Sequence, residues 1–342
     1  MNNVRFPAEW EKDCAILVAM PHENTDWHYI IDEVTECYIN LIKAFAKKGI
    51  TTIVVSPDSN KTRNILRDIE QSKVIYFDAD TNDTWTRDYG PLTIEKNGKL
   101  TVEDFKFNGW GLKFAACHDN LVTGKLCQSC LITAPRDNRL GFVRVGGSLE
   151  SDGNGTLLTT ARCLESPNRN GDLSREQIES RLAEWLGIKK FLWLEYGALE
   201  GDDTDSHIDT LARIAPYDTI IYTGCNDKND SHFDELNKMK LELEAFVTRN
   251  GNKFNLVELP LPSPIYDEDG MRLPATYANY LVTPQAIFMP VYNQILNDRT
   301  AKGILEAVFE KEVITVDCTP LIKQHGSLHC ATMQIPIEAL CL

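Results

Sequence analysis

The sequence predicts an α/β fold, because short β-rich runs alternate with amphipathic helical stretches along its 342 residues. Two observations carry this prediction. Buried-strand patterns such as CAILVAM (14–20) are followed by apolar residues at helical spacing, and glycines mark the boundaries between the two. The strand–helix–strand pattern recurs about five times without a low-complexity linker, so we expect one domain over residues 1–342.

The clearest unit lies near the start of the chain, where residues 30–48 carry apolar side chains at helical spacing and end at Gly49. The run TTIVVSP (51–57) then returns as a strand. Further helices are expected at 60–70, from 174, at 234–250 and at 299–309, and further strands at 73–78, 189–195, 218–224, 255–259, 286–292 and 313–317. Residues 84–160 are more β-rich and contain turn signals such as Asn97-Gly98. Neither glycine-rich phosphate-binding motif is present, which argues against Rossmann and P-loop proteins.

Composition indicates which kinds of ligand and which cellular compartment to expect. The formal net charge is −15 and the isoelectric point is about 5.0, so nucleic acid is not an expected partner and cationic ligands are favoured. The ten cysteines are scattered rather than arranged as a disulfide framework. With no apolar run long enough for a membrane span and no export signal, we expect a cytoplasmic protein with reduced thiols.

Four segments carry residue types suited to catalysis. They are TWTRDYGP (84–91), GGSLESDG (146–153), GDDTDSHID (201–209) and GSLHC (326–330). In the third, a strand is predicted from Asp205 onward, and its alternation places Asp205, His207 and Asp209 on one face. Carboxylates clustered around a histidine cost stability unless a cation offsets them, which favours a functional role for His207 and Asp209. For Asp202 and Asp203 a solvated turn is the simpler interpretation.

Cys330 is the candidate nucleophile. A lone cysteine is more often a small core residue, but this one follows a Gly-Ser turn and has histidines elsewhere in the chain to serve it. If the segment is extended, His329 points to the opposite face from Cys330. His207 is therefore the expected partner.

Together with FNGWG (107–111), NRN (168–170) and RLPATYANY (272–280), the four segments resemble the agmatine deiminase family of the guanidino-modifying penteins. The resemblance runs from about residue 7 to residue 336. It implies a five-bladed, pseudo-fivefold α/β-propeller. It also implies hydrolysis of agmatine to N-carbamoylputrescine and ammonia through a covalent thiouronium intermediate, as in putrescine and polyamine biosynthesis, without metal or cofactor.

The resemblance also implies roles for individual residues. Cys330 matches the family nucleophile and His207 the general acid/base. Asp88 and Asp209 match the carboxylates that hold the guanidinium group, and Trp85 walls the substrate channel. This chemistry needs two carboxylates because bidentate hydrogen bonds orient the planar cation for attack by a thiolate.

Recognition of the far ammonium group of agmatine is the point at which the sequence departs from the family. Many members carry an acidic residue directly before the Gly-Gly pair, where this chain has Val145. Glu150 is the first candidate to replace it, provided that Gly146-Gly147 introduces a bulge into a strand. Asp203 and Asp205 are the other candidates.

Three alternatives remain open from sequence. A peptidyl-arginine deiminase shares the chemistry but needs an open channel for a peptide. A metal hydrolase is conceivable because Asp205, His207, Asp209 and a cysteine are metal-ligand types. A non-catalytic module could use Cys127 and Cys130 as half of a zinc site, although no second half is present. A homo-oligomer is compatible with the sequence.

Overall fold

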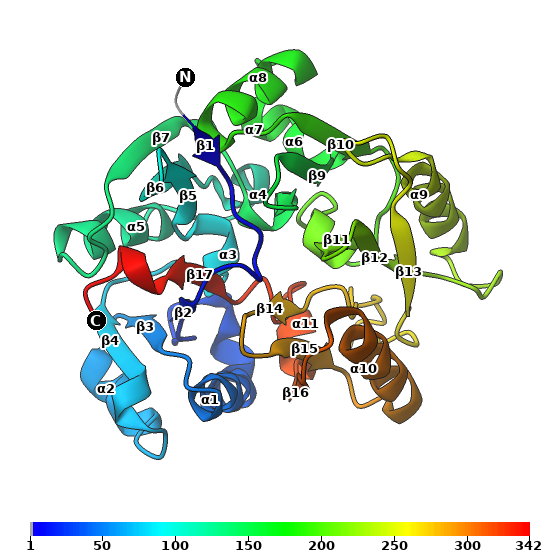
Figure 1. Ribbon diagram of the computed structural model, residues 1–342. Helices are drawn as coiled ribbons and strands as arrows, with labels where there is room; N and C mark the ends of the chain where they lie inside the picture. Colours follow the sequence, from blue (N-terminus) through cyan, green and yellow to red (C-terminus); the bar gives the residue numbers. More distant parts are fainter. Residues whose placement is uncertain (1–2) are drawn as a thin grey trace.

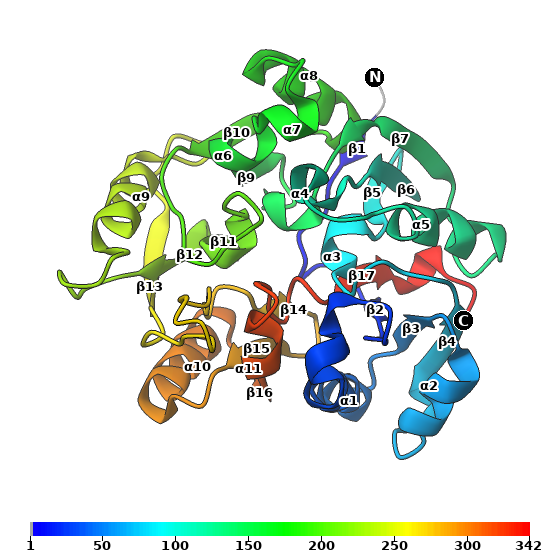
Figure 2. The same ribbon diagram turned by 180° about the vertical axis from the view of Figure 1, so that it is seen from behind.

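The computed structural model describes residues 3–342 and contains five small sheets. Figure 1 shows these sheets placed around a central region, with the longer helices on the outside, and Figure 2 shows the same arrangement from behind. Each sheet combines at least one parallel pair of strands with one or more antiparallel neighbours. Parallel pairs require crossover connections, which explains the regular alternation of strands and helices in the sequence.

The strands, in the order in which they pair, are β17 (Met333–Pro336), β2 (Cys14–Ala19), β3 (Thr52–Ser56) and β4 (Val74–Asp78); β1 (Val4–Arg5), β5 (Leu92–Lys96), β6 (Lys99–Lys106) and β7 (Arg136–Val143); β10 (Lys190–Leu194), β9 (Thr156–Thr160) and β8 (Glu150–Ser151); β11 (Ala212–Ala215), β12 (Thr219–Gly224) and β13 (Asn255–Pro260); and β14 (Leu281–Val282), β15 (Ile287–Val291) and β16 (Val313–Asp317).

The helices are α1 (Ile31–Lys47), α2 (Ser59–Ile65), α3 (Thr86–Tyr89), α4 (Gly109–Leu112), α5 (Asp119–Gln128), α6 (Ala161–Leu164), α7 (Pro167–Asn170), α8 (Arg175–Leu186), α9 (Phe233–Ala245), α10 (Ile295–Phe309) and α11 (Thr319–Ile322). Short 3-10 helices are η1 (Asp26–Ile30), η2 (Gln71–Lys73), η3 (Gly146–Ser148), η4 (Ile208–Thr210) and η5 (Ile337–Ala339). Within residues 3–342 no helix combines the length and apolar character that a bilayer crossing requires.

The α/β prediction is confirmed, and most of the expected elements form within a few residues of their predicted bounds. Helix α1 buries Tyr38, Leu41 and Phe45, which are spaced three or four residues apart along one face. Helix α8 begins with a capping box between Ser174 and Gln177. Between β5 and β6, Asn97 and Gly98 both adopt positive φ (53° and 77°), as a tight two-residue hairpin requires.

The second strand and the last strand of the described chain lie next to each other in one sheet. Strand β17 pairs antiparallel with β2, with Met333 opposite Leu17, while the residues before β2 cross the central region (Figure 1). Because β17 begins three residues after Cys330, this pairing ties the candidate nucleophile to the N-terminal sheet.

Two local expectations were wrong. Residues 204 and 205 form a bend, η4 follows at Ile208, and strand β11 begins only at Ala212, so Asp205, His207 and Asp209 do not share a strand face. The cause is the carboxylate of Asp202, which accepts hydrogen bonds from the backbone N–H of Thr204 (3.0 Å) and Ser206 (2.6 Å) and folds the chain into a turn. Likewise, the Gly-Gly pair begins the 3-10 helix η3 instead of making a strand bulge.

Candidate active site

Cys330 lies in a turn before β17 and is held by Asn279. The Asn279 side-chain amide donates to Cys330 Sγ at 3.2 Å, and its oxygen accepts the backbone N–H of His329 at 2.9 Å and of Cys330 at 3.2 Å. The thiol is buried, with only 4% of the residue exposed. Asn279 therefore fixes both the backbone and the sulfur of the candidate nucleophile.

The carboxylate of Asp209 is the nearest acidic group to the thiol. Its Oδ2 accepts from Cys330 Sγ at 3.7 Å and is 2.7 Å from His329 Nδ1, while its Oδ1 has no hydrogen-bond partner in the described part of the chain. Burial raises the pKa of Cys330 well above its usual value, and Asp209 and Asp88 raise it further. Without a cation nearby, the thiol is therefore protonated at neutral pH.

Asp88 is presented by the short helix α3 and is anchored from two sides. Its Oδ1 accepts the backbone N–H of Gly147 at 2.9 Å, and its Oδ2 accepts the indole N–H of Trp110 at 2.9 Å. A Cβ on Gly147 would lie 2.5 Å from His207 Nδ1 and 2.9 Å from Asp209 Oδ2. Only glycine therefore lets η3 approach these two side chains closely enough to donate to Asp88.

His207 is fully buried at the start of η4, with Nδ1 3.8 Å from Asp88 Oδ1. Burial alone lowers the pKa of His207, but Asp88, Cys163 and Asp209 oppose this effect and bring the pKa to about 9. Neither ring nitrogen has a hydrogen-bond partner within residues 3–342. A buried, protonated histidine with two free donors is suited to give a proton to a bound molecule.

The expectation that His329 points away from the site was wrong. The segment around it is a turn and not an extended strand, so the ring reaches Asp209 through Nδ1 and Glu9 through Nε2 (2.6 Å). His329 lowers the pKa of Asp209 against the opposing effect of burial. Because both ring nitrogens of His329 contact carboxylates, this residue positions Asp209. The ring nitrogens of His207, in contrast, have no partner in the described chain.

A pocket opens onto Cys330 and Asp88, whereas neither Asp209 nor His207 is among the residues that line it. It is lined by Asp83, Trp85, Asp88, Trp110, Phe114, Asp203, Thr204, Gln324, His325, Gly326 and Cys330. The predicted wall residue Trp85 packs so closely against Gly326 that a Cβ there would overlap the indole ring. Burial raises the pKa of both Asp83, to about 7, and Asp203.

Glu150 does not line this pocket, which contradicts the prediction that it binds the substrate amine. Its carboxylate is buried and occupied by Arg213 Nε at 2.8 Å and by the backbone N–H of Ile214 at 3.1 Å. Asp205 is also occupied, by Lys113 at 3.0 Å and by Arg169 at 2.9 Å. Of the three acidic candidates, only Asp203 lines the pocket.

Sequence analysis assigned no role to Asn279, Trp110 or Asp83. Asn279 lies in RLPATYANY and Trp110 in FNGWG, so the two motifs contained the signal although neither residue type suggested catalysis. Asp83 directly precedes the TWTRDYGP segment. Among residues 3–342, no three His, Cys, Asp or Glu side chains are grouped closely enough to hold a metal ion. Cys127 lies in the last turn of α5, and Cys130 follows the helix in an exposed turn.

Comparison with known proteins confirms the resemblance seen in the sequence. The model of the Porphyromonas-type peptidyl-arginine deiminase family matches residues 5–336. A Porphyromonas gingivalis structure provisionally named arginine deiminase is 44% identical, with a TM-score of 0.94 over 99% of this chain and 100% of that chain. An agmatine deiminase from C. jejuni with substrate bound is 36% identical, with a TM-score of 0.92 over 98% and 97% of the two chains. A Mycoplasma mycoides protein provisionally named agmatine deiminase is 30% identical over 97% of this chain and 95% of that protein.

Proposed function

Because the chain belongs to the Porphyromonas-type peptidyl-arginine deiminase family, we propose that it is a guanidino hydrolase that converts agmatine into N-carbamoylputrescine and ammonia. The observation that carries the proposal is one pocket lined at once by Cys330, by Asp88 and by two further carboxylates, Asp83 and Asp203. A molecule with a cation at each end matches this distribution of negative charge.

The first half of the reaction begins when the substrate enters. Asp88 and Asp209 accept hydrogen bonds from the guanidinium nitrogens, and the positive charge offsets the carboxylates that raise the pKa of the Cys330 thiol. The thiol releases its proton to water, and the sulfur adds to the guanidinium carbon. His207, protonated at neutral pH, gives its proton to one amino group, which leaves as ammonia.

The second half releases the product. The carbon stays bonded to Cys330 Sγ as a thiouronium, and His207 is now neutral. His207 removes a proton from water, and the hydroxide adds to the thiouronium carbon. The carbon–sulfur bond then breaks as the new hydroxyl group passes its proton to the leaving Cys330 sulfur, which gives the urea and restores the thiol. Neither half needs a metal or an organic cofactor in this proposal.

Agmatine suits the pocket better than arginine or a peptidyl-arginine. A free arginine requires a cation for its α-carboxylate, yet no lysine or arginine is among the residues that line the pocket. An ammonium group near Asp83 and Asp203 favours their ionised forms, which burial alone disfavours.

We propose in addition that the five sheets are the blades of a pseudo-fivefold propeller, and that residues 1–342 form one domain that acts in the cytoplasm. The support for the propeller is the arrangement of sheets around a centre (Figure 1) and the return of β17 to β2. One cooperative unfolding transition by calorimetry is expected, and two separable transitions would contradict the single domain.

The reaction is tested by mixing the protein briefly with agmatine and quenching with acid. Mass spectrometry should find the peptide that contains Cys330 heavier by agmatine less ammonia. Steady-state assays should give kcat/KM for agmatine at least about a hundredfold above that for arginine or an arginyl peptide. The proposal is overturned if no adduct forms and agmatine releases no ammonia. A higher kcat/KM for the arginyl peptide would favour a peptidyl-arginine deiminase instead.

The tail contact is tested separately by Asp203→Asn. This change should raise KM for agmatine about tenfold with little change in kcat, because it removes an interaction made equally in the ground and transition states. The exposed neighbour Glu200, changed to Gln, is the matched control and should leave KM unchanged. An unaltered KM in Asp203→Asn assigns the amine to Asp83.

A further inference from the structure

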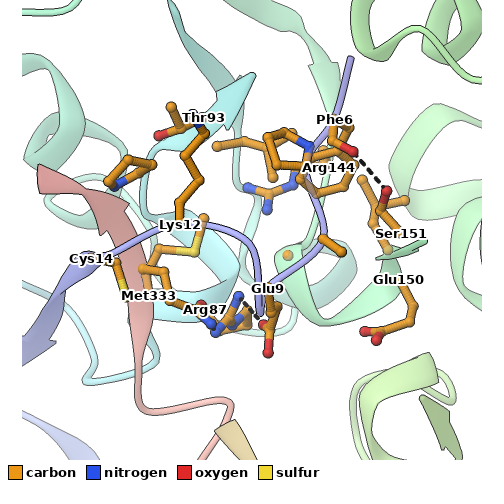
Figure 3. Close-up of a pocket in the computed structure, with 17 residues that line it drawn as sticks. Phe6, Glu9, Lys12, Cys14, Arg87, Thr93, Arg144, Glu150, Ser151 and Met333 are labelled. Atoms are coloured by element: carbon orange, nitrogen blue, oxygen red, sulfur yellow. Dashed lines mark hydrogen bonds and ion pairs between the residues drawn. The ribbon is translucent and has the colours of Figure 1, made fainter. Parts of the chain in front are cut away.

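A second cavity lies on the other side of η3 from the candidate active site. Its interior volume is about 70 Å³, and it is bounded by the N-terminal segment at Phe6–Ala8, by Arg87 and Arg144, and by Thr93 of β5. Figure 3 shows these side chains gathered around the N-terminal segment. Gly146 belongs to this side, since a Cβ there would lie 2.8 Å from the Arg144 guanidinium, whereas Gly147 faces His207.

Arg144 is the unusual residue of this cavity, because its charge is buried without a carboxylate. Only 2% of the residue is exposed, yet no carboxylate oxygen within residues 3–342 lies within 4.0 Å of its guanidinium nitrogens. Its one hydrogen bond is long, from Nη1 to the carbonyl of Gly90 at 3.4 Å, and its Nε has no partner in the described structure. Buried guanidinium groups are ordinarily paired, so a free one is costly.

The other buried arginines show what is missing. Arg87 contacts Glu9 at 3.1 Å, Arg213 contacts Glu9 and Glu150, and Arg169 contacts Asp205 at 2.9 Å. Each of these cations therefore has an anionic partner supplied by the chain, which Arg144 lacks.

The acidic residues of the cavity are already occupied. Glu9 is bound by Arg87, Arg213 and His329, and Glu150 by Arg213 and a backbone N–H. Lys12 adds a second cation to the lining, although Glu95 holds it at 2.8 Å.

Arg144 nevertheless keeps its charge. Burial lowers its pKa to about 9, with a partial opposing effect from Asp88 and Asp104. At neutral pH it is therefore still protonated, and the cavity holds one positive charge that no side chain of the cavity balances.

Thr93 provides an independent second observation. Its hydroxyl is buried and has no hydrogen-bond partner in residues 3–342, and the residue lines the same cavity. Two residues with unsatisfied buried donors, one of them charged, thus line one cavity, where unpaired polar groups call for a ligand. The remaining wall includes apolar side chains at Phe6, Leu149 and Met333.

We propose that this cavity binds a small monovalent carboxylate, with its oxygens on the Arg144 guanidinium and on the Thr93 hydroxyl and its short apolar part against Phe6 and Leu149. The planar fork of Arg144 matches a planar carboxylate, and a single negative charge balances the single unpaired cation. The site is separate from the guanidinium pocket, so its test does not depend on the proposed deiminase activity.

Acetate is the probe. Increasing acetate should raise the Tm of the wild-type protein along a saturating curve, because a ligand that binds only the folded state stabilises it by mass action. Arg144→Met keeps the length of the side chain and removes the unpaired charge, and it should lose the acetate-dependent rise. Thr93→Val should weaken apparent acetate binding severalfold, to about tenfold.

The matched control is Arg139→Met, which removes a cation that pairs with Glu103 outside this cavity and should leave the acetate response intact. The proposed carboxylate site is overturned if acetate raises the Tm of wild type and of Arg144→Met similarly. It is also overturned if the Tm of the wild type shows no saturable rise up to about 100 mM acetate. If Arg144→Met does not fold, a crystal structure of the wild type at that concentration decides. Planar density against Arg144 supports the proposal, and water alone there overturns it.

Discussion

Two clusters of buried charge lie on either side of His329, and they differ in how fully their polar atoms are satisfied. In the paired cluster, every acid meets a base within 3.1 Å; its members are Glu9, Glu150, Arg87 and Arg213. In the reactive cluster, both nitrogens of His207 and one oxygen of Asp209 lack partners within the described chain; its members are Asp88, His207, Asp209 and Cys330. His329 joins the two through Glu9 and Asp209.

This difference helps to distinguish buried charged residues that stabilise the fold from residues of the same type that contact a ligand. Buried polar atoms are nearly always hydrogen-bonded, so an unpaired atom inside a group of reactive side chains is a candidate contact for a ligand. This criterion favours a structural role for Glu150 and a functional role for Asp209, although the sequence offered both as substrate contacts. The predictions below test that division, and they run from the largest expected effect to the smallest.

The reactive cluster is broken most severely at its nucleophile. Cys330→Ser should lose more than about 99% of ammonia release while still binding agmatine, because a hydroxyl in this acidic site cannot replace the thiolate. Ammonia release and calorimetric binding measure the two effects. Cys117→Ser, at an exposed thiol, is the control. Activity above about one per cent in Cys330→Ser would falsify the assignment.

The paired cluster is broken by Arg213→Met. This leaves Glu9 and Glu150 partly uncompensated in the interior and should lower the free energy of unfolding by about 3–5 kcal/mol. Urea titration measures the loss. Arg175→Met removes a partly exposed pair with Glu165 and should cost about 1 kcal/mol or less. Equal losses in the two variants would show that the buried cluster does not stabilise the fold.

Asp88→Asn tests the carboxylate that η3 and Trp110 anchor. One of its oxygens becomes an NH₂ group that faces the donor of Gly147 or of Trp110, and the negative charge disappears. We expect transition-state stabilisation to weaken by about 2–5 kcal/mol, so that kcat/KM falls roughly thirtyfold to several thousandfold. A fall of less than about tenfold would place Asp88 in the structural class.

Asp119→Asn is the matched control for that variant. Burial raises the pKa of Asp119 to about 8, so its carboxyl group is already largely neutral at pH 7. The amide should therefore be tolerated there, with kcat/KM within about twofold of the wild type.

The parts of the fold that the sequence predicted are those governed by local periodicity. Helix α1 repeats its apolar residues with the helical period, and strand β12 is a short, continuous buried run, so both are recognisable from local sequence. The bend before η4 was not predicted, because the alternating residues were interpreted as a strand. In the structure the Asp202 carboxylate accepts hydrogen bonds from the backbone N–H groups two and four residues ahead, which turns the chain.

The candidate site was predictable where the motif also suggested the chemistry. Cys330, Asp88 and Asp209 combine reactive types with conspicuous segments, and the structure brings them together; their catalytic roles remain predictions. Glu150 was misassigned because its partner Arg213 is 63 positions away and no local pattern reveals a salt bridge at that distance. Asn279 was missed because an amide that positions a thiol looks like any other amide in sequence.

The smallest expected effect concerns the acidity of His207. Its pKa is raised to about 9, so the protonated acid is present at neutral pH and is lost as the pH rises through that value. The profile of kcat/KM for agmatine should accordingly fall above about pH 9, since kcat/KM reports the free enzyme.

Cys163 is one of the groups that raise this pKa, together with Asp88 and Asp209, although burial opposes all three. Cys163→Ala should therefore move the falling limb of the profile to lower pH by less than about one unit, leaving the plateau nearly unchanged. Cys127→Ala, on α5, should not move it. A limb that stays in place in Cys163→Ala, or one that moves upward, would show that His207 is not the group whose proton is lost. The unpaired nitrogens of His207 would then have to serve binding instead of proton transfer.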